Sequence, residues 1–332
     1  MPTRLALALL LTLAGCRPVG QGVIPPDLAT RPIRVVATTG MVADMVREVG
    51  GPRVAVRALM GPGVDPHLYK ASEGDVLRMA EADLVVYSGL HLEGRMADLF
   101  ERMGALGRRT LAVTDAMPPE RLHDAPGTPG VHDPHVWFDV SLWRASAPLV
   151  ARTLAALDPA HAADYARRAD AYGARLDALD RDVAAEILRV PEPNRVLVTA
   201  HDAFGYFGAR YGVRVVGLQG ISTAAEAGTA DVQRLAERLT RERIPAIFVE
   251  SSVPRRTLDA VVAAVRARGG TIRIGGSLYS DALGSPGSGA DTYEGMVRTN
   301  VRTITSALGA VPVVARPPAG TTTQTQRAAS SR

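Results

Sequence analysis

The sequence predicts an α/β protein of two lobes, each a parallel sheet flanked by helices, joined by one long rigid helix. Three observations carry this prediction. Short apolar, β-branched runs alternate with segments of helical periodicity. The second half of the chain resembles the first, and a stretch almost free of glycine and proline separates the two. Alternation of strands and helices is typical of parallel sheets covered by helices.

Eight short apolar runs bounded by turn residues are the predicted strands. Four lie in each half of the chain, at residues 33–38, 54–59, 84–87, 110–113, 195–199, 214–218, 246–250 and 271–274. The run ending at Thr38 precedes a helix that ends at Gly50, and the run ending at Thr199 precedes a helix that ends at Gly212. This similarity predicts an N-terminal lobe at 32–157 and a C-terminal lobe at 191–311.

Residues 158–190 are predicted to form the helix between the lobes. Pro159 suits the first turn of a helix, and Gly173 is the one glycine between residues 158 and 188. Apolar residues recur every three or four positions, at Ala163, Tyr165, Ala169, Tyr172, Leu176, Leu179, Val183 and Ile187. Such a stripe marks one buried helix face, with His161 expected on the exposed face. A single helix predicts limited hinge motion, with any bend at Gly173.

The first residues indicate export from the cytoplasm. Arg4 precedes the apolar run 5–14, which is too short to span a membrane, and the motif LAGC ends at Cys16. LAGC resembles a bacterial lipobox. We therefore predict a signal peptide at 1–15 and lipidation of Cys16, the one cysteine in the chain.

The two ends of the mature chain lack the pattern of a packed core. Residues 16–31 are rich in proline and glycine and are predicted to form a flexible tether. Residues 312–332 are predicted to be disordered. We expect an extracytoplasmic, membrane-anchored protein, and a tethered domain outside the membrane favours binding or surface chemistry.

The charge distribution argues against a nucleic-acid partner. The formal net charge is +4, and of the 38 basic residues one, Lys70, is lysine. The arginines are scattered among acidic residues and form no basic stripe interleaved with aromatic residues. We expect no nucleic acid among the partners.

Four residues form a candidate metal site: His67, His135, His201 and Asp281. Two of the histidines end the same tripeptide, Asp-Pro-His, while the third directly follows a predicted strand and the aspartate follows the loop after the last strand. Ligands of parallel α/β sheets bind beyond the carboxyl ends of the strands. Imidazoles with a carboxylate are ligands of Zn²⁺. Each lobe supplies two of the four residues, so the site is expected in the cleft between the lobes.

Three acidic residues accompany these candidates. Asp65 and Asp133 begin the two Asp-Pro-His tripeptides, where they either orient the histidines or stabilise turns. Glu250 ends a predicted strand and is a candidate partner of a ligand, a helix cap or a general base. The other four histidines are interpreted as structural: His91, His123, His132 and His161. For His123 and His132, which flank the loop 124–131, transient metal capture is the minority interpretation.

Six segments of the chain, taken in order, resemble one known family. They are GPGVDPHLY (61–69), DPHVWFD (133–139), VTAHDAFGYF (198–207), GLQGIST (217–223), IFVESS (247–252) and YSDAL (279–283). They resemble the cluster A-I solute-binding proteins of zinc and manganese ABC transporters, in particular the TroA-type members. The resemblance runs from about residue 33 to residue 308.

The resemblance implies a non-catalytic protein that binds one divalent ion through His67, His135, His201 and Asp281. It would deliver this ion, as a monomer, to a membrane permease driven by a cytoplasmic ATPase. His201 stands where some manganese-selective members carry glutamate. Residues 117–132 are short and hold two histidines, which departs from the long histidine-rich loop of many zinc-dedicated members.

The sequence leaves open which ion is bound and whether the protein has one of two alternative functions. Three imidazoles favour Zn²⁺, whereas the carboxylate of Asp281 suits Mn²⁺, and we expect Zn²⁺ to bind more tightly. One alternative is a binding protein for a siderophore or haem chelate on a similar frame. Another is an extracytoplasmic zinc hydrolase with Glu250 as base, although four protein ligands leave little room for an activated water.

Overall fold

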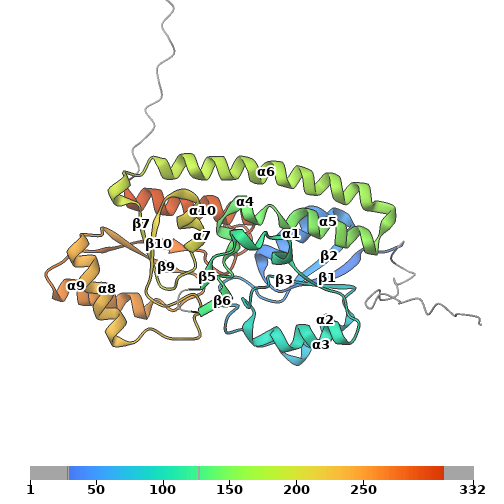
Figure 1. The fold of residues 1–332 in the computed structure, drawn as a ribbon, viewed down its shortest axis with the longest axis horizontal. Helices are drawn as coiled ribbons and strands as arrows, with labels where there is room; N and C mark the ends of the chain where they lie inside the picture. Colours follow the sequence, from blue (N-terminus) through green and yellow to red (C-terminus); the bar gives the residue numbers. More distant parts are fainter. Residues whose placement is uncertain (1–27, 29, 126–127, 310–332) are drawn as a thin grey trace, which may run out of the picture.

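The computed structural model describes residue 28 and residues 30–125 and 128–309. Two α/β lobes lie side by side beneath one long helix (Figure 1). The N-terminal lobe contains a parallel sheet in the order β2-β1-β3-β4, made of β1 (Ile33–Ala37), β2 (Val54–Ala58), β3 (Leu84–Tyr87) and β4 (Thr110–Ala112). Its helices are α1 (Gly40–Gly50), α2 (Glu73–Glu81), α3 (Ala97–Ala105), α4 (Val140–Trp143) and α5 (Ser146–Leu157).

Alternate residues of β1 serve opposite faces of this sheet. Val35 and Ala37 belong to the main core, which includes residues of α1 and α5. Val36 belongs to a smaller core beneath α2 and α3, which is rich in methionine. A strand directs successive side chains to opposite faces, so the near-continuous apolar run reflects a sheet covered on both sides.

The C-terminal lobe repeats this topology. Here β7 (Val196–Thr199) pairs in parallel with β8 (Arg214–Gly217), β9 (Ala246–Glu250) pairs in parallel with β10 (Arg273–Leu278), and β7 lies beside β9. The spatial order 8-7-9-10 corresponds to the order 2-1-3-4 of the first lobe. Its helices are α7 (Gly205–Tyr211), α8 (Thr229–Glu242), α9 (Arg256–Ala267) and α10 (Tyr293–Leu308). The predicted α/β class with parallel sheets is therefore confirmed.

The last strand differs from its prediction. The sequence placed it at 271–274 with the following glycines in a loop, but β10 continues through them to Leu278, with a bulge between Ile274 and Gly276. A Cβ atom on Gly275 would lie 2.7 Å from the Phe248 ring and 2.9 Å from Ala307. The glycine therefore allows β10 to pass close beneath α10, which a sequence pattern does not reveal.

Helix α6 (Ala162–Leu188) is 27 residues long, about 40 Å, and contacts α1 and α5 of the first lobe and α7 and α10 of the second. It continues through Gly173 without a break. Seven of the eight predicted apolar positions are buried, and the exception, Ala163, is exposed. His161 lies in the 3₁₀ turn before the helix, with its Nδ1 2.9 Å from Asp158, and not on the exposed helix face.

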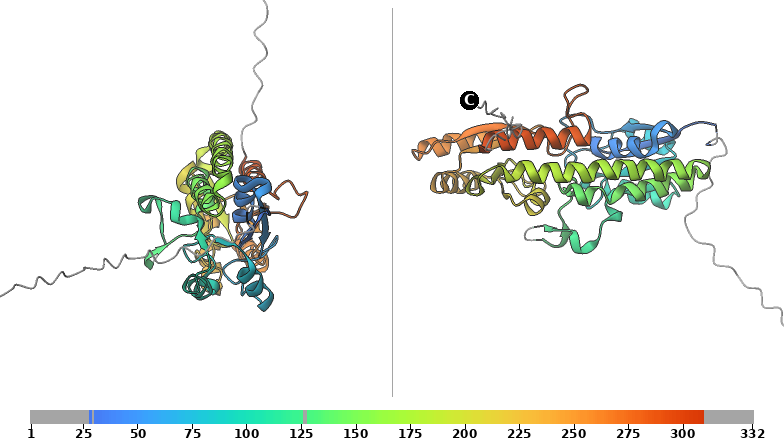
Figure 2. Two further views of the ribbon diagram at one scale, coloured as in Figure 1. Left: turned by 90° about the vertical axis from the view of Figure 1, so that its right-hand side faces the viewer. Right: turned by 90° about the horizontal axis from the view of Figure 1, so that it is seen from above.

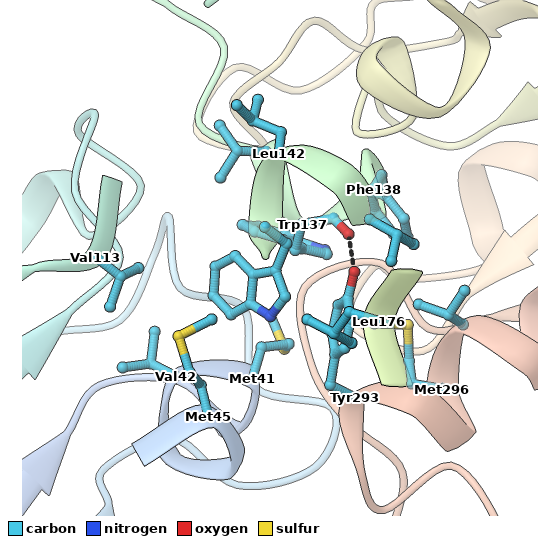
Figure 3. Close-up of a cluster of buried hydrophobic side chains, with 14 of the residues drawn as sticks. Met41, Val42, Met45, Val113, Trp137, Phe138, Leu142, Leu176, Tyr293 and Met296 are labelled. Carbon is cyan, nitrogen blue, oxygen red and sulfur yellow. Dashed lines mark hydrogen bonds between the residues drawn. The ribbon is translucent and has the colours of Figure 1, made fainter. Parts of the chain in front are cut away.

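The main hydrophobic core crosses both lobes. The Trp137 ring lies beside methionines of α1, and Tyr293 of α10 approaches it from the other lobe (Figure 3). The Tyr293 hydroxyl donates a hydrogen bond to the Trp137 carbonyl over 2.6 Å. Arg175 of α6 adds ion pairs to Glu48 of α1 and to Glu294 of α10. The lobes are thus packed together along α6.

A small antiparallel hairpin interrupts the α/β pattern of the first lobe. Its strands, β5 (Asp124–Ala125) and β6 (Thr128–His132), lie in the segment expected to be a short loop. Figure 2 shows this segment standing away from the helices and the parallel sheets. Among the described residues, no helix is long and apolar enough to cross a membrane.

The predicted signal peptide, the lipidated Cys16 and the C-terminal tail lie outside the described residues. Most of the predicted tether does so as well. Leu28, which the prediction places in the tether, is 2 % exposed and belongs to the main core. Its carbonyl accepts a hydrogen bond from Arg53 over 2.8 Å, so the chain is already packed at this residue.

Candidate metal centre

The four candidate ligands lie together between the two lobes. His67 comes from the loop between β2 and α2, and His135 lies between β6 and α4. His201 follows β7, and Asp281 follows β10 at the carboxyl end of the second sheet. The four residues are at most 5 % exposed, and one ligand atom from each lies within 4.8 Å of the others. The structure therefore brings together all four residues predicted from the sequence.

Three of the distances between ligand atoms are close to the edge of a small coordination polyhedron. His67 Nε2 lies 3.3 Å from His135 Nε2, His135 Nε2 lies 3.5 Å from Asp281 Oδ1, and His201 Nε2 lies 3.3 Å from Asp281 Oδ2. Bonds of about 2.0–2.1 Å to a tetrahedral Zn²⁺ place its ligands about 3.3–3.4 Å apart. The arrangement suits one bare ion at its centre.

Carboxylates position the three histidines. Asp133 Oδ1 lies 2.7 Å from His135 Nδ1 and accepts its backbone N–H over 3.0 Å. Glu250 does the same for His201, with Oε2 2.6 Å from Nδ1 and Oε1 accepting the backbone N–H over 2.9 Å. Because each carboxylate contacts Nδ1, the Nε2 atom of the same histidine points toward the centre of the cluster. Glu250 thus contacts a candidate ligand, as expected of a carboxylate that orients a metal-binding histidine.

Asp65 acts on the backbone of its histidine. Its Oδ1 accepts the His67 N–H over 2.8 Å, as expected of an Asp-Pro-His turn. Its Oδ2 accepts the Thr223 hydroxyl over 2.6 Å. Thr223 belongs to the C-terminal lobe, so this hydrogen bond joins the two lobes beside the cluster. The sequence offered no sign of this pairing, because the two residues lie far apart in the chain.

The cluster holds its charges unevenly. Burial lowers the pKa of His67 to about 3, so its ring is neutral. Burial acts in the same direction on His135, but the Asp133 and Asp281 carboxylates outweigh it and raise its pKa to about 9. The pKa of His201 is raised for the corresponding reason by Glu250 and Asp281. Burial opposes the charge of Asp281, yet these two imidazolium groups hold its pKa well below the ordinary value.

Two buried atoms of the cluster, His201 Nε2 and Asp281 Oδ1, make no hydrogen bond of good geometry among the described residues; each has only its ion-pair contact, over 3.3 Å to Asp281 Oδ2 and over 3.5 Å to His135 Nε2. Buried polar atoms are nearly always hydrogen-bonded, so atoms left with such contacts alone favour a ligand between them. Asp281 Oδ2 accepts the Ser252 hydroxyl over 3.1 Å, and the Trp137 indole N–H donates to the Ser280 carbonyl over 3.0 Å. These two supports were not predicted, because they join distant segments.

The fold and this cluster define a class of protein. Two α/β lobes joined by one long helix, with four ligand-type side chains buried between them, form a binding protein whose site lies between its lobes. The family model described as "ZnuA: Zinc-uptake complex component A periplasmic" matches residues 35–307. The chain belongs to this family of metal-binding solute-binding proteins of ABC transporters, which are transport proteins and not enzymes.

Relatives named for different metals match the chain over most of its length. The manganese-binding lipoprotein MntA of Bacillus subtilis is 47% identical over 296 residues, covering 89% of this chain and 95% of the relative. The zinc-binding protein TroA of Treponema pallidum is 46% identical over 277 residues, covering 82% and 88%. The solved structure of periplasmic TroA from Treponema pallidum superposes with a TM-score of 0.81 at 45% identity, covering 83% of this chain and 99% of that one.

Proposed function

We propose that this protein captures one divalent metal ion, Zn²⁺ or Mn²⁺, and delivers it to the permease of an ABC transporter. His67, His135, His201 and Asp281 would be its ligands. The observation that carries the proposal is the spacing of the ligand atoms, 3.3–3.5 Å along three contacts of a buried cluster. This spacing suits a bare ion better than a siderophore or haem chelate, since the buried atoms lie within 4.8 Å of one another.

Zn²⁺ is the ion that we expect to bind more tightly. Three imidazole nitrogens and one carboxylate form a common zinc ligand set, and Zn²⁺ lies above Mn²⁺ in intrinsic affinity for such sites. Asp281 offers one oxygen toward His135 and the other toward His201. Binding through both oxygens would suit Mn²⁺, which favours carboxylate ligands. The transported ion therefore depends on availability as well as on affinity.

We further propose that lipidated Cys16 anchors the protein on the outer side of a membrane, beside the permease and its cytoplasmic ATPase. The lipobox-like motif LAGC supports this anchor. Several relatives are named as substrate-binding lipoproteins of metal ABC transporters, including the manganese protein PsaA of Streptococcus mitis. The protein would act as a monomer, and one chain supplies all four proposed ligands, so binding needs no second chain.

Titration of the metal-free protein with Zn²⁺ and with Mn²⁺, in competition with a chelator, tests the proposal. We expect one ion per chain, tighter binding of Zn²⁺, and a large loss in Asp281→Ala. Asp170→Ala, which removes an exposed carboxylate of α6, is the matched control and should bind as the wild type does. Absence of binding, or affinity indifferent to Asp281, would refute the assignment.

A further inference from the structure

Two cavities meet at a wall that carries two histidines outside the cluster. One cavity, of about 580 Å³, lies at the mouth of the cleft and is lined by His67 of the cluster, Asp202, His91 and His132. The other, of about 590 Å³, lies on the N-terminal lobe and is also lined by His91 and His132. Their neighbours Leu90 and Val131 line both cavities as well. Two dipeptides, from the loop after β3 and from β6, therefore separate the cavities.

The backbone at His91 is strained. Gly89, Leu90 and His91 have φ angles of 99°, 50° and 62°. Two consecutive residues with side chains in the left-handed region are uncommon. Buried Glu93 keeps the loop in this shape, because its carboxylate accepts the N–H groups of Ser88 and Gly89 over 2.8 and 3.3 Å. Strain that the surrounding structure maintains is often found at functional sites, and here it holds an exposed imidazole at the mouth.

His132 faces the same space from the hairpin. Its side chain is 32 % exposed, yet its Nδ1 is buried without a hydrogen-bond partner among the described residues. Asp124 Oδ1, on β5, lies 3.3 Å from this nitrogen. Imidazole nitrogens near a carboxylate are suitable ligands for a divalent transition-metal ion.

We propose that His91 and His132 form an entry station, which briefly holds an incoming divalent transition-metal ion before it reaches the buried cluster. This inference rests on the proposed function. Both histidines line a cavity that His67 also lines, so an ion held there shares that cavity with one ligand of the cluster. A station with two imidazole ligands is weaker than a site with four, which lets the ion move inward.

The station predicts a distinct kinetic signature. Removing it raises the barrier between the free and the bound ion without changing the energy of either end state. The association and dissociation rate constants should therefore fall by the same factor, and the equilibrium affinity should stay unchanged. Damage to the cluster itself would instead weaken the affinity.

Stopped-flow mixing of the metal-free protein with Zn²⁺ tests this signature. Trp137 reports binding by its fluorescence, because its ring lies 5.2 Å from the His135 ring. The test variant combines His91→Asn, since asparagine tolerates positive φ, with His132→Gln. His161→Gln, at the start of α6 and outside both cavities, is the matched control. We expect about a tenfold fall of both rate constants in the double variant and none in the control.

The possible results separate this inference from the proposed function. Unchanged rate constants in the double variant, with one Zn²⁺ still bound per chain, would overturn the entry station alone. A lower association rate with an equally lower affinity would also overturn it, because the histidines would then act on the final site. A wild-type protein that binds no Zn²⁺ would refute the proposed function instead. Should the double variant fail to fold, His132→Gln alone must still slow both rates.

Discussion

His135 in the N-terminal lobe and His201 in the C-terminal lobe each have a carboxylate that contacts the ring and the backbone, but the two carboxylates come from different kinds of structure. In each case one carboxylate lies against Nδ1 and accepts the backbone N–H. Asp133 is two residues from its histidine, with a proline between them, whereas Glu250 ends strand β9, beside β7. The first half of the centre is therefore organised by a tripeptide, and the second half by the packing of a sheet.

The largest effect is expected when a ligand is removed from the half of the metal centre that the sheet organises. Binding free energies of about 10–16 kcal/mol for four-ligand zinc sites suggest about 2.5–4 kcal/mol per ligand. We therefore expect His201→Ala to weaken Zn²⁺ binding about 100- to 1,000-fold, measured by chelator competition. His123→Ala, which removes a histidine stacked on Tyr206, is a control with near-normal affinity. Similar affinities in both variants would count against the cluster as the binding site.

The second test compares the two positioning carboxylates. Removing a carboxylate that orients a ligand histidine costs about 10–100-fold in metal affinity. We expect Glu250→Ala near the upper end, because no local restriction of the chain replaces its contact with the His201 backbone. Asp133→Ala should lie near the lower end, because Pro134 still restricts the local turn. Titration of both variants with Zn²⁺ under one condition shows which loses more affinity. A larger loss in Asp133→Ala would contradict the expected order.

The third test is the pH dependence of binding. Without metal, a proton occupies His135 below a pH of about 9, and the pKa of His201 is also raised. The ion must displace these protons, so its apparent affinity should fall as pH falls from about 9 to 6, by about tenfold per unit for each proton displaced. His67, with a pKa of about 3, adds nothing in this range. Titrations at several pH values that give a flat affinity would contradict this charge distribution.

The smallest effect is expected where the lobes touch beside the centre. Thr223→Val removes the hydroxyl that donates to Asp65 and leaves the Asp65 contact with the His67 backbone in place. A single hydrogen bond contributes about 1 kcal/mol, so we expect at most about a fivefold loss of Zn²⁺ affinity in the same titration. Ser222→Ala, which removes a hydroxyl at the neighbouring exposed position, is the control. A loss as large as that of His201→Ala would show that lobe contact, more than ligand geometry, determines affinity.

The same comparison explains what the sequence predicted. The Asp-Pro-His tripeptides contain their own positioning group, and His201 follows a strand whose apolar run is unambiguous, so these ligands were found without the structure. Ser252, Thr223 and Trp137 were missed because their partners are remote in the chain. The end of β10 was missed because Gly275 resembles a loop residue, although contact with Phe248 requires it.

The shared core beneath α6 has a consequence for unfolding. Residues of one continuous cluster come from β1 of the first lobe, from α6, and from β9 and α10 of the second, including Val35, Tyr172, Phe248 and Ile304. Neither lobe can lose its structure without exposing apolar surface of the other, so heating should melt both in one cooperative transition. An ion bound between the lobes then stabilises the whole described chain, and the temperature of that single transition becomes a measure of its free concentration.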